Sequence, residues 1–128
     1  MGDITNLAGV IRVHGEAQGD KTALILGDRT QSWAELRDRS AQVAQGLLAA
    51  GVGEQERVAF LDKNGFEHFE VMFGAAMINA VSVDVNWRLA APEVEFIVND
   101  TEAKVLVVGP DFVPILDAIA PNLTHVTT

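Results

Sequence analysis

Residues 58–85 read VAFLDKNGFEHFEVMFGAAMINAVSVDV, and this stretch decides the fold. Its first four residues, Val58–Leu61, are all apolar, which predicts a central strand covered on both faces. The apolar side chains that follow recur at helical spacing, and they are Phe66, Phe69, Phe73 and Ala76. From Val81 to Val85 apolar and polar residues alternate, which predicts a second strand. A strand, a helix and a strand in this order predict parallel pairing through a right-handed crossover.

The helix inside this stretch has a predicted start. Asn64 is expected to cap its amino terminus, and Glu67 lies in the first turn, where the helix dipole favours negative charge. The alternation of helices and strands then continues toward the carboxyl terminus. It predicts a helix from about Pro92 to Asn99, a buried strand at Val105–Val108, a helix at Phe112–Ile119 and a last strand at Thr124–Thr128.

Toward the amino terminus the pattern begins with an amphipathic helix at Ile4–Ala17. A hairpin is predicted next, with strands at Thr22–Leu26 and Thr30–Ser32 joined by the Gly27-Asp28 turn. Ser32-Trp33-Ala34-Glu35 has the form of a capping box that starts a helix, and Gly51 takes the left-handed position at its end. The apolar face of this helix is Leu36, Val43, Ala44, Leu47 and Leu48.

These elements predict the α/β class, with a layered, mostly parallel, doubly wound sheet flanked by helices. The 128 residues suit one domain, and no repeat or linker divides them. No run of about 18 apolar residues predicts a transmembrane helix, and the first residues lack the features of a signal peptide. With no cysteine in the chain, a cytoplasmic location is expected.

The charge of the chain argues against nucleic acid as a partner. The formal net charge is −9, and from Gly65 onward only Arg88 and Lys104 oppose nine carboxylates. Phosphate backbones are bound by clusters of lysine and arginine, and the sequence contains no such cluster. Anionic membrane surfaces are disfavoured for the same reason.

The sequence offers few residues for catalysis. Gly51-Val52-Gly53 follows a helix, so it is interpreted as a helix end instead of a dinucleotide-binding loop. His14, His68 and His125 are scattered and are expected at the surface. Two acidic pairs, Glu67 with Glu70 and Glu93 with Glu95, are expected on solvated helix faces. We therefore assign no catalytic, cofactor-binding or metal-binding residue.

Two groups of residues are candidates for a substrate pocket. The stripe Phe66, Phe69, Met72, Phe73 and Met77 is suited to an acyl pocket, but core packing is the favoured interpretation and the two are compatible. Asn86, Trp87 and Arg88 are the substrate-pocket candidates, because they leave the carboxyl end of a strand, where open α/β sheets bind ligands. The favoured alternative has Trp87 packed over the sheet edge and Arg88 paired with Glu93 or Glu95.

Motifs along almost the whole chain resemble those of the adenylate-forming superfamily, which includes the AMP-forming acyl-CoA synthetases. Asn86-Trp87-Arg88-Leu89, with Glu93 and Asp100, is especially similar to the fatty-acyl ligases. Asn79 departs from a usual glycine, and Asp84 from a common proline. The other matching segments are Asp20–Leu24, Thr30–Leu36, Leu47–Val58, Phe60–Glu67 and Phe73–Val81.

The resemblance implies the first subdomain of a fatty-acid–CoA ligase, which forms an acyl-adenylate from ATP with Mg²⁺ and passes the acyl group to coenzyme A. The family's Ser/Thr/Gly-rich loop and its other phosphate-binding motifs do not occur here. Residues 1–128 are therefore expected to be the amino-terminal part of a larger domain, truncated at the carboxyl end, inactive alone and without tight cofactor binding. The unfinished sheet edge favours self-association. The alternative is a stand-alone α/β module that binds or regulates a full-length ligase.

Overall fold

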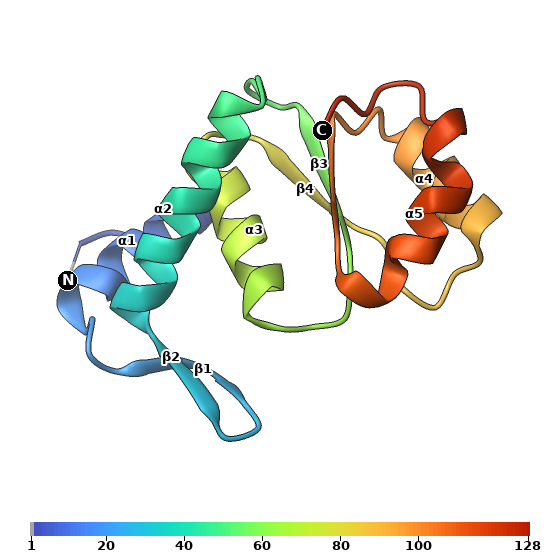
Figure 1. Cartoon of the computed structure of the whole chain (residues 1–128). Coiled ribbons are helices and arrows are strands. Elements are labelled where there is room, and N and C mark those ends of the chain that lie inside the picture. The colour runs from blue at the N-terminus through green and yellow to red at the C-terminus, as the bar shows by residue number, and fades with distance from the viewer. Residues whose placement is uncertain (1) are drawn as a thin grey trace.

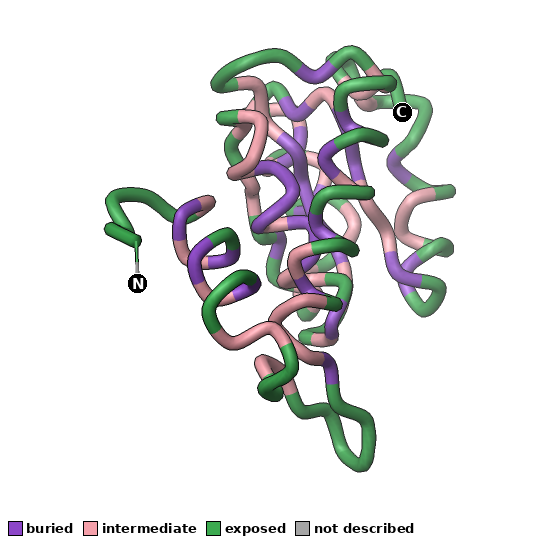
Figure 2. Tube along the Cα trace, turned by 90° about the vertical axis from the view of Figure 1, so that its left-hand side faces the viewer, coloured by how far each residue is buried: buried purple, intermediate pink, exposed green. Residues whose placement is uncertain are grey.

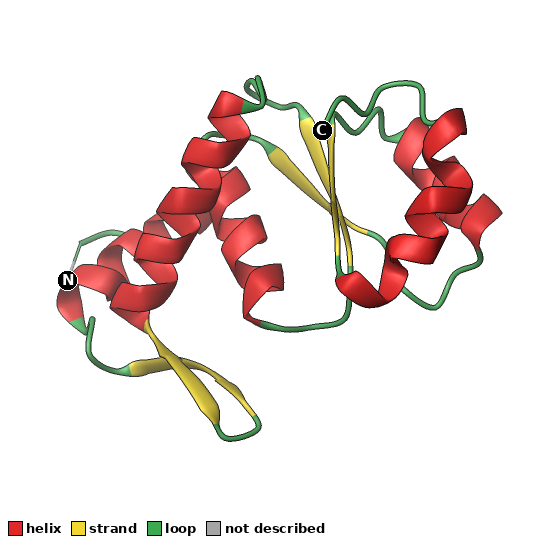
Figure 3. Ribbon diagram, in the orientation of Figure 1, coloured by secondary structure: helices red, strands yellow, loops and turns green. Residues whose placement is uncertain are grey.

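The computed structural model describes residues 2–128, so Met1, the first residue of the predicted domain, lies outside it. Helices and strands alternate along most of the chain, with a small hairpin near the amino terminus (Figures 1 and 3). The elements are α1 (Leu7–Ala17), β1 (Thr22–Leu26), β2 (Arg29–Ser32), α2 (Trp33–Ala49), β3 (Arg57–Leu61), α3 (Phe66–Met77), β4 (Val81–Asp84), α4 (Ala91–Asp100), β5 (Val105–Val108) and α5 (Val113–Ile119).

The central sheet is parallel, with the strand order β4-β3-β5. Val58 of β3 is in register with Ser82 on one side and Val105 on the other. Because β4 and β5 lie on opposite sides of β3, the connecting helices cover opposite faces, with α2 and α3 on one side and α4 and α5 on the other (Figure 1). The predicted doubly wound parallel sheet is confirmed.

Alternate residues of β3 supply the two cores. Val58 and Phe60 pack with Leu47 of α2 and Val71 of α3. Ala59 and Leu61 point the other way, toward the side chains of α4 and α5 that include Val94, Val98 and Ile119. Figure 2 shows buried residues running through the middle of the molecule, whereas the tip of the hairpin is exposed. The all-apolar sequence of β3 therefore reflects burial on both faces.

The hairpin and α2 form as the sequence predicts. β1 and β2 pair antiparallel, and Gly27 takes the left-handed conformation (φ 62°) at the turn. The Ser32 side chain accepts from the Glu35 N–H at 3.1 Å, while Glu35 Oε2 accepts from the Ser32 N–H at 2.8 Å. Gly51 has φ 81° after the helix, as expected for the stop position. Leu48, predicted on the apolar face, is instead 50% exposed.

Two other predictions about element ends are wrong in detail. Asn64 does not cap α3: Gly65 occupies the N-cap position, and no side chain accepts a hydrogen bond there. Residues 124–128 do not form a strand. The Thr127 N–H nevertheless donates to the Lys104 carbonyl at 2.9 Å, and the Leu106 N–H donates to the Thr128 carbonyl at 3.0 Å. These bonds place the last residues along the outer edge of β5.

Asn79 stands where the family that the sequence resembles usually has glycine. It adopts the left-handed conformation with φ 57°. Asparagine is one of the few non-glycine residues that tolerate this region, so the turn between α3 and β4 is kept. The Asn79 side chain also accepts a hydrogen bond from Gln55 Nε2 at 2.8 Å. Within residues 2–128, no helix combines the length and the apolar character needed to cross a membrane.

Candidate functional site

The loops that leave the carboxyl ends of β3, β4 and β5 meet at one end of the sheet. The chain leaves β3 for α3 on one face, whereas it leaves β4 and β5 for helices on the other face. Such a divergence opens a crevice between loops, which is the usual ligand position in open α/β sheets. We call this region the carboxyl edge.

A cleft of about 330 Å³ lies at the carboxyl edge. This volume is at the lower end of the range of about 300–1,000 Å³ that small-molecule sites occupy. Two of the three sequence-predicted pocket residues, Asn86 and Trp87, line it. The lining residues are Phe60, Asp62, Asn64, His68, Asp84, Val85, Asn86 and Trp87.

Two cations lie over the Trp87 ring. The Arg88 guanidinium carbon is 4.3 Å from its ring centroid, and Lys63 Nζ is 5.2 Å from it. The indole is half-buried and packs on Phe112, with ring centroids 6.1 Å apart. Lys63 Nζ is also 3.7 Å from Asp111 Oδ2. A cation on an aromatic face is stabilised by the ring quadrupole while its N–H groups stay open to a ligand.

The alternative interpretation of this loop is half right. Trp87 does pack against the core cluster of α4 and α5. Arg88, however, forms no ion pair with Glu93 or Glu95 in the part of the chain that the structure describes. Glu93 Oε2 accepts from the Ala90 N–H at 2.8 Å instead, because it completes the start of α4.

Asn86 shapes the loop. Its side-chain Oδ1 accepts a hydrogen bond from the Arg88 N–H at 3.0 Å, which is a turn stabilised by an asparagine side chain. Asn86 and Arg88 are both exposed. The three predicted residues therefore have different roles: Asn86 fixes the turn and Trp87 forms a wall of the cleft, whereas Arg88 does not line the cleft and places its charge over the Trp87 ring.

His68, which the sequence predicts to be an isolated surface residue, also lines the cleft. Its Nε2 lies 3.6 Å from Asp84 Oδ2, and its ring packs edge-on against Phe60 with centroids 5.1 Å apart. The signal was present in the topology: β4 pairs beside β3, so its last residue, Asp84, reaches the start of α3. His14, by contrast, bonds to Gln18 and stacks on Trp33.

One acidic residue does not lie where the sequence predicts. Glu70 is only 4% exposed, not on a solvated face. Its Oε1 accepts from Gln31 Nε2 at 2.8 Å and lies 3.4 Å from Arg39 Nε. A buried carboxylate needs such partners, because an unpaired charge in the core is strongly destabilising. Glu70 thus joins β2 and α2 to α3.

The aromatic stripe of α3 serves mainly as core. Phe66 and Phe73 are buried, and Phe69, Met72 and Met77 pack against the cluster that Ile11 and Leu36 form with Phe73. Phe66 and Phe69 also line a small depression of about 100 Å³ under the hairpin. This volume is well below that of a small-molecule site, which supports the core interpretation.

At the opposite end of the sheet, a hydrogen bond and an ion pair of Glu56 stabilise the segment just before β3. The Gly53 N–H donates to Glu56 Oε2 at 2.6 Å, and Lys104 Nζ lies 3.3 Å from the same oxygen. The backbone hydrogen bond, aided by the charge of Lys104, holds the pKa of Glu56 below its ordinary value. This cluster is structural and lies away from the carboxyl edge.

Comparison with known proteins gives one consistent family. The family model described as "AMP-binding enzyme" matches residues 11–128. The fatty acid–[acyl-carrier-protein] ligase ScoC of Streptomyces coeruleorubidus is 35% identical over 104 residues, which is 81% of this chain and 20% of ScoC. The long-chain-fatty-acid–CoA ligase FadD13 of Mycobacterium tuberculosis is 39% identical over 92 residues, or 72% of this chain and 18% of FadD13.

A solved structure of a CoA ligase also resembles this chain. The anthranilate CoA ligase AuaEII, in complex with anthranoyl-AMP, superposes with a TM-score of 0.91 and 28% sequence identity over 98% of this chain and 24% of AuaEII. The chain therefore spans about a fifth of the length of the curated relatives it matches.

Proposed function

Because the chain belongs to the AMP-binding enzyme family, we propose that it is the amino-terminal part of an ATP-dependent carboxylic acid–CoA ligase. One observation carries the proposal: the family match spans residues 11–128, while relatives such as ScoC and FadD13 are about four times as long as this chain. We also infer that the acid is a fatty acid, since ScoC and FadD13 are fatty-acid ligases by name.

The proposed reaction has two steps. A carboxylate oxygen of the acid attacks the α-phosphorus of ATP and releases pyrophosphate, which leaves an acyl-adenylate. The thiol of coenzyme A then attacks the acyl carbon and releases AMP. Reactions of this kind depend on positioned positive charge around the phosphates. The complex of AuaEII with anthranoyl-AMP supports the adenylate route for the family.

The residues of this chain supply only part of what the reaction needs. Arg88 and Lys63, which both lie over the Trp87 ring, offer N–H donors to an anionic group of a substrate. Residues 2–128 contain no group of three or more acidic or histidine side chains placed to hold a metal ion, so this part of the chain offers no magnesium site built from protein side chains alone. We therefore propose that the chain forms one wall of the substrate site and that residues outside it hold the ATP and the metal.

Pyrophosphate exchange tests the proposed function. A polypeptide extended past Thr128 is expected to exchange labelled pyrophosphate into ATP only when a carboxylic acid is present. A panel of long-chain, short-chain and aromatic acids identifies the acid class, with the highest kcat/KM expected for a fatty acid. Exchange that never depends on an added acid would contradict the ligase proposal, and a clear preference for aromatic acids would contradict the fatty-acid part alone.

Arg88 gives a second test in the same extended protein. Arg88→Gln removes one charge-assisted contact beside the cleft, so we expect KM for an anionic substrate to rise about tenfold or more. Arg12→Gln, an exposed arginine on α1, is the matched control. Unchanged kinetics in Arg88→Gln would remove this residue from the substrate site.

The edge of the central sheet is a proposed site of self-association. β4 is an edge strand, and its Val81 is 38% exposed. An unpaired strand edge favours pairing with another chain. Residues 1–128 are expected to show concentration-dependent association in sedimentation experiments. A monodisperse monomer with a single cooperative unfolding transition would instead favour the stand-alone binding or regulatory module.

A further inference from the structure

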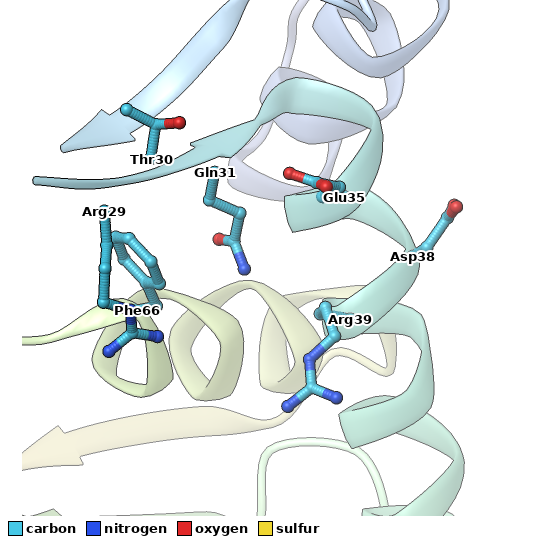
Figure 4. A pocket seen from close by; sticks show the side chains of 7 residues that line it. All are labelled: Arg29, Thr30, Gln31, Glu35, Asp38, Arg39 and Phe66. Atoms are coloured by element: carbon cyan, nitrogen blue, oxygen red, sulfur yellow. The ribbon is translucent and has the colours of Figure 1, made fainter. Parts of the chain in front are cut away.

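A second, larger hollow lies between β2, the first two turns of α2 and the start of α3 (Figure 4). Its volume is about 470 Å³, and it shares no lining residue with the cleft at the carboxyl edge. We call it the β2–α2 hollow. It is lined by Arg29, Thr30, Gln31, Glu35, Asp38, Arg39 and Phe66.

The arginines of this hollow have unused donors. The Arg29 guanidinium lies over the Phe66 ring, 4.8 Å from its centroid, and forms no ion pair within residues 2–128. Arg39 uses only Nε, which is 3.4 Å from Glu70 Oε1, and its side chain is 57% exposed. In Figure 4 both guanidinium groups lie over α3, with Gln31 between them.

The carboxylates around the hollow are, in contrast, already engaged. Glu35 accepts from the Ser32 N–H at 2.8 Å as part of the capping box. Asp38 accepts from Arg37 Nε at 2.9 Å. Glu70, at the buried side, accepts from Gln31 Nε2 at 2.8 Å. Arg29 and the two terminal nitrogens of Arg39 therefore have N–H donors that no carboxylate of residues 2–128 occupies.

We propose that the β2–α2 hollow binds a phosphoryl group between Arg29 and Arg39. A guanidinium presents a planar fork of N–H donors that matches two oxygens at once. Two forks on opposite sides match the four oxygens of a tetrahedral anion, whereas a carboxylate has only two oxygens and satisfies one fork. The site does not rest on the ligase proposal, because it shares no residue with the carboxyl edge.

Titration with inorganic phosphate at constant ionic strength, followed by NMR at the side-chain Nε–Hε groups, tests this site. Arg29 and Arg39 are expected to shift along one saturable curve, with a dissociation constant of about 1 mM for two exposed charge-assisted contacts. Acetate is expected to bind about tenfold more weakly, since it satisfies one fork. Titration with AMP then separates two sources: tighter binding than inorganic phosphate assigns the site to an organic phosphate, and equal binding assigns it to the free ion.

Substitutions make the test specific. Arg29→Gln is expected to weaken phosphate binding about tenfold or more, and Arg29→Lys, which keeps the charge but not the fork, is expected to fall in between. Arg12→Gln, outside the hollow, is expected to bind like the wild type. Arg29 contacts only Phe66 among the groups described above, so its loss should leave the fold intact, as circular dichroism would verify. The proposal is wrong if neither arginine shifts saturably, or if Arg39 shifts in Arg29→Gln with the same dissociation constant as in the wild type.

Discussion

The carboxyl edge and the β2–α2 hollow both place an arginine on an aromatic ring, but they are built differently. At the edge, Arg88 stacks on its sequence neighbour Trp87, and the loop that carries both is set by Asn86. In the hollow, Arg29 of β2 stacks on Phe66, which belongs to α3 and is far away in the sequence. One arrangement is local, and the other depends on tertiary packing.

The difference teaches how each region depends on the fold. The loop at the edge keeps its turn through a contact between neighbours, so only its position requires the sheet beneath it. The hollow exists only while β2, α2 and α3 stay packed, and the buried Gln31–Glu70 hydrogen bond joins them. Changes in the α2–α3 contact should therefore disturb the hollow and spare the Asn86–Arg88 loop of the carboxyl edge.

The largest loss of stability is expected from a substitution in the core beneath the carboxyl edge. Leu61, the last residue of β3, is fully buried below the carboxyl edge. Leu61→Ala should lower the free energy of unfolding by about 2–5 kcal/mol, as measured by urea denaturation, because it leaves a cavity in the core. Leu48→Ala, at a leucine that is 50% exposed, is the control and should change stability by about 0.5 kcal/mol or less. Similar losses in both variants would show that the core is not where the structure places it.

The second-largest loss of stability is expected when the buried hydrogen bond between Gln31 and Glu70 is removed. Gln31→Leu should destabilise the fold by about 1–3 kcal/mol, because Glu70 then loses a donor in a buried position. The double variant Gln31→Leu with Glu70→Leu should recover most of this loss, since both partners are then apolar. A double-mutant cycle in thermal unfolding measures the coupling. Strictly additive losses would mean that the two side chains do not interact.

A smaller change in stability is expected from a substitution at the contact between α2 and α3. A Cβ at Gly74 would lie 2.9 Å from the Ser40 carbonyl oxygen, so Gly74→Ala forces α3 away from α2. Overpacking costs about 1–3 kcal/mol, which exceeds the gain in helix propensity of about 1 kcal/mol. Gly46→Ala, on α2 with open space around it, should instead stabilise the protein by about 0.5–1 kcal/mol.

The two alanine variants should also differ in their spectra. Gly74→Ala should shift the NMR signals of Arg29 and Arg39 while the Trp87 indole signal stays in place, and Gly46→Ala should move none of them. Equal stabilisation by both substitutions would contradict the close packing of α2 on α3.

The smallest effect is a pH dependence at the opposite end of the sheet. The pKa of Glu56 is lowered in the fold from its ordinary 4.5, first by the Gly53 N–H, so the carboxylate form is favoured by folding. The stability that it adds is present above pH 4.5 and is lost as the pH falls through the lowered pKa. Glu56→Gln should flatten this part of the stability curve and leave both cationic regions unchanged. The same slope in the variant would assign it to another group.

The sequence predicts the fold well where the signals are local. Val58–Leu61 is apolar throughout because both of its faces are covered, and the capping box at Ser32 and Glu35 involves residues three apart. The sequence does not reveal that Asn64 leaves the helix uncapped, because Gly65 takes the N-cap position of α3 and has no side-chain acceptor.

The candidate sites are predictable only in part. Asn86, Trp87 and Arg88 follow from their place after a strand, but their partner does not: Lys63 reaches the indole from another loop. Glu70 looks like a solvated helix residue, and only the hairpin packed over it makes it buried. Such contacts depend on tertiary packing between segments distant in the sequence, which periodicity does not encode.

The central claim is that this chain supplies a wall of the proposed ligase site and not its chemistry. Acid-dependent exchange of pyrophosphate into ATP by residues 1–128 alone, with Mg²⁺ and a fatty acid present, tests it most directly. We expect no exchange above the rate without protein, while the polypeptide extended past Thr128 is active under the same conditions. Acid-dependent exchange by residues 1–128 alone would contradict the claim.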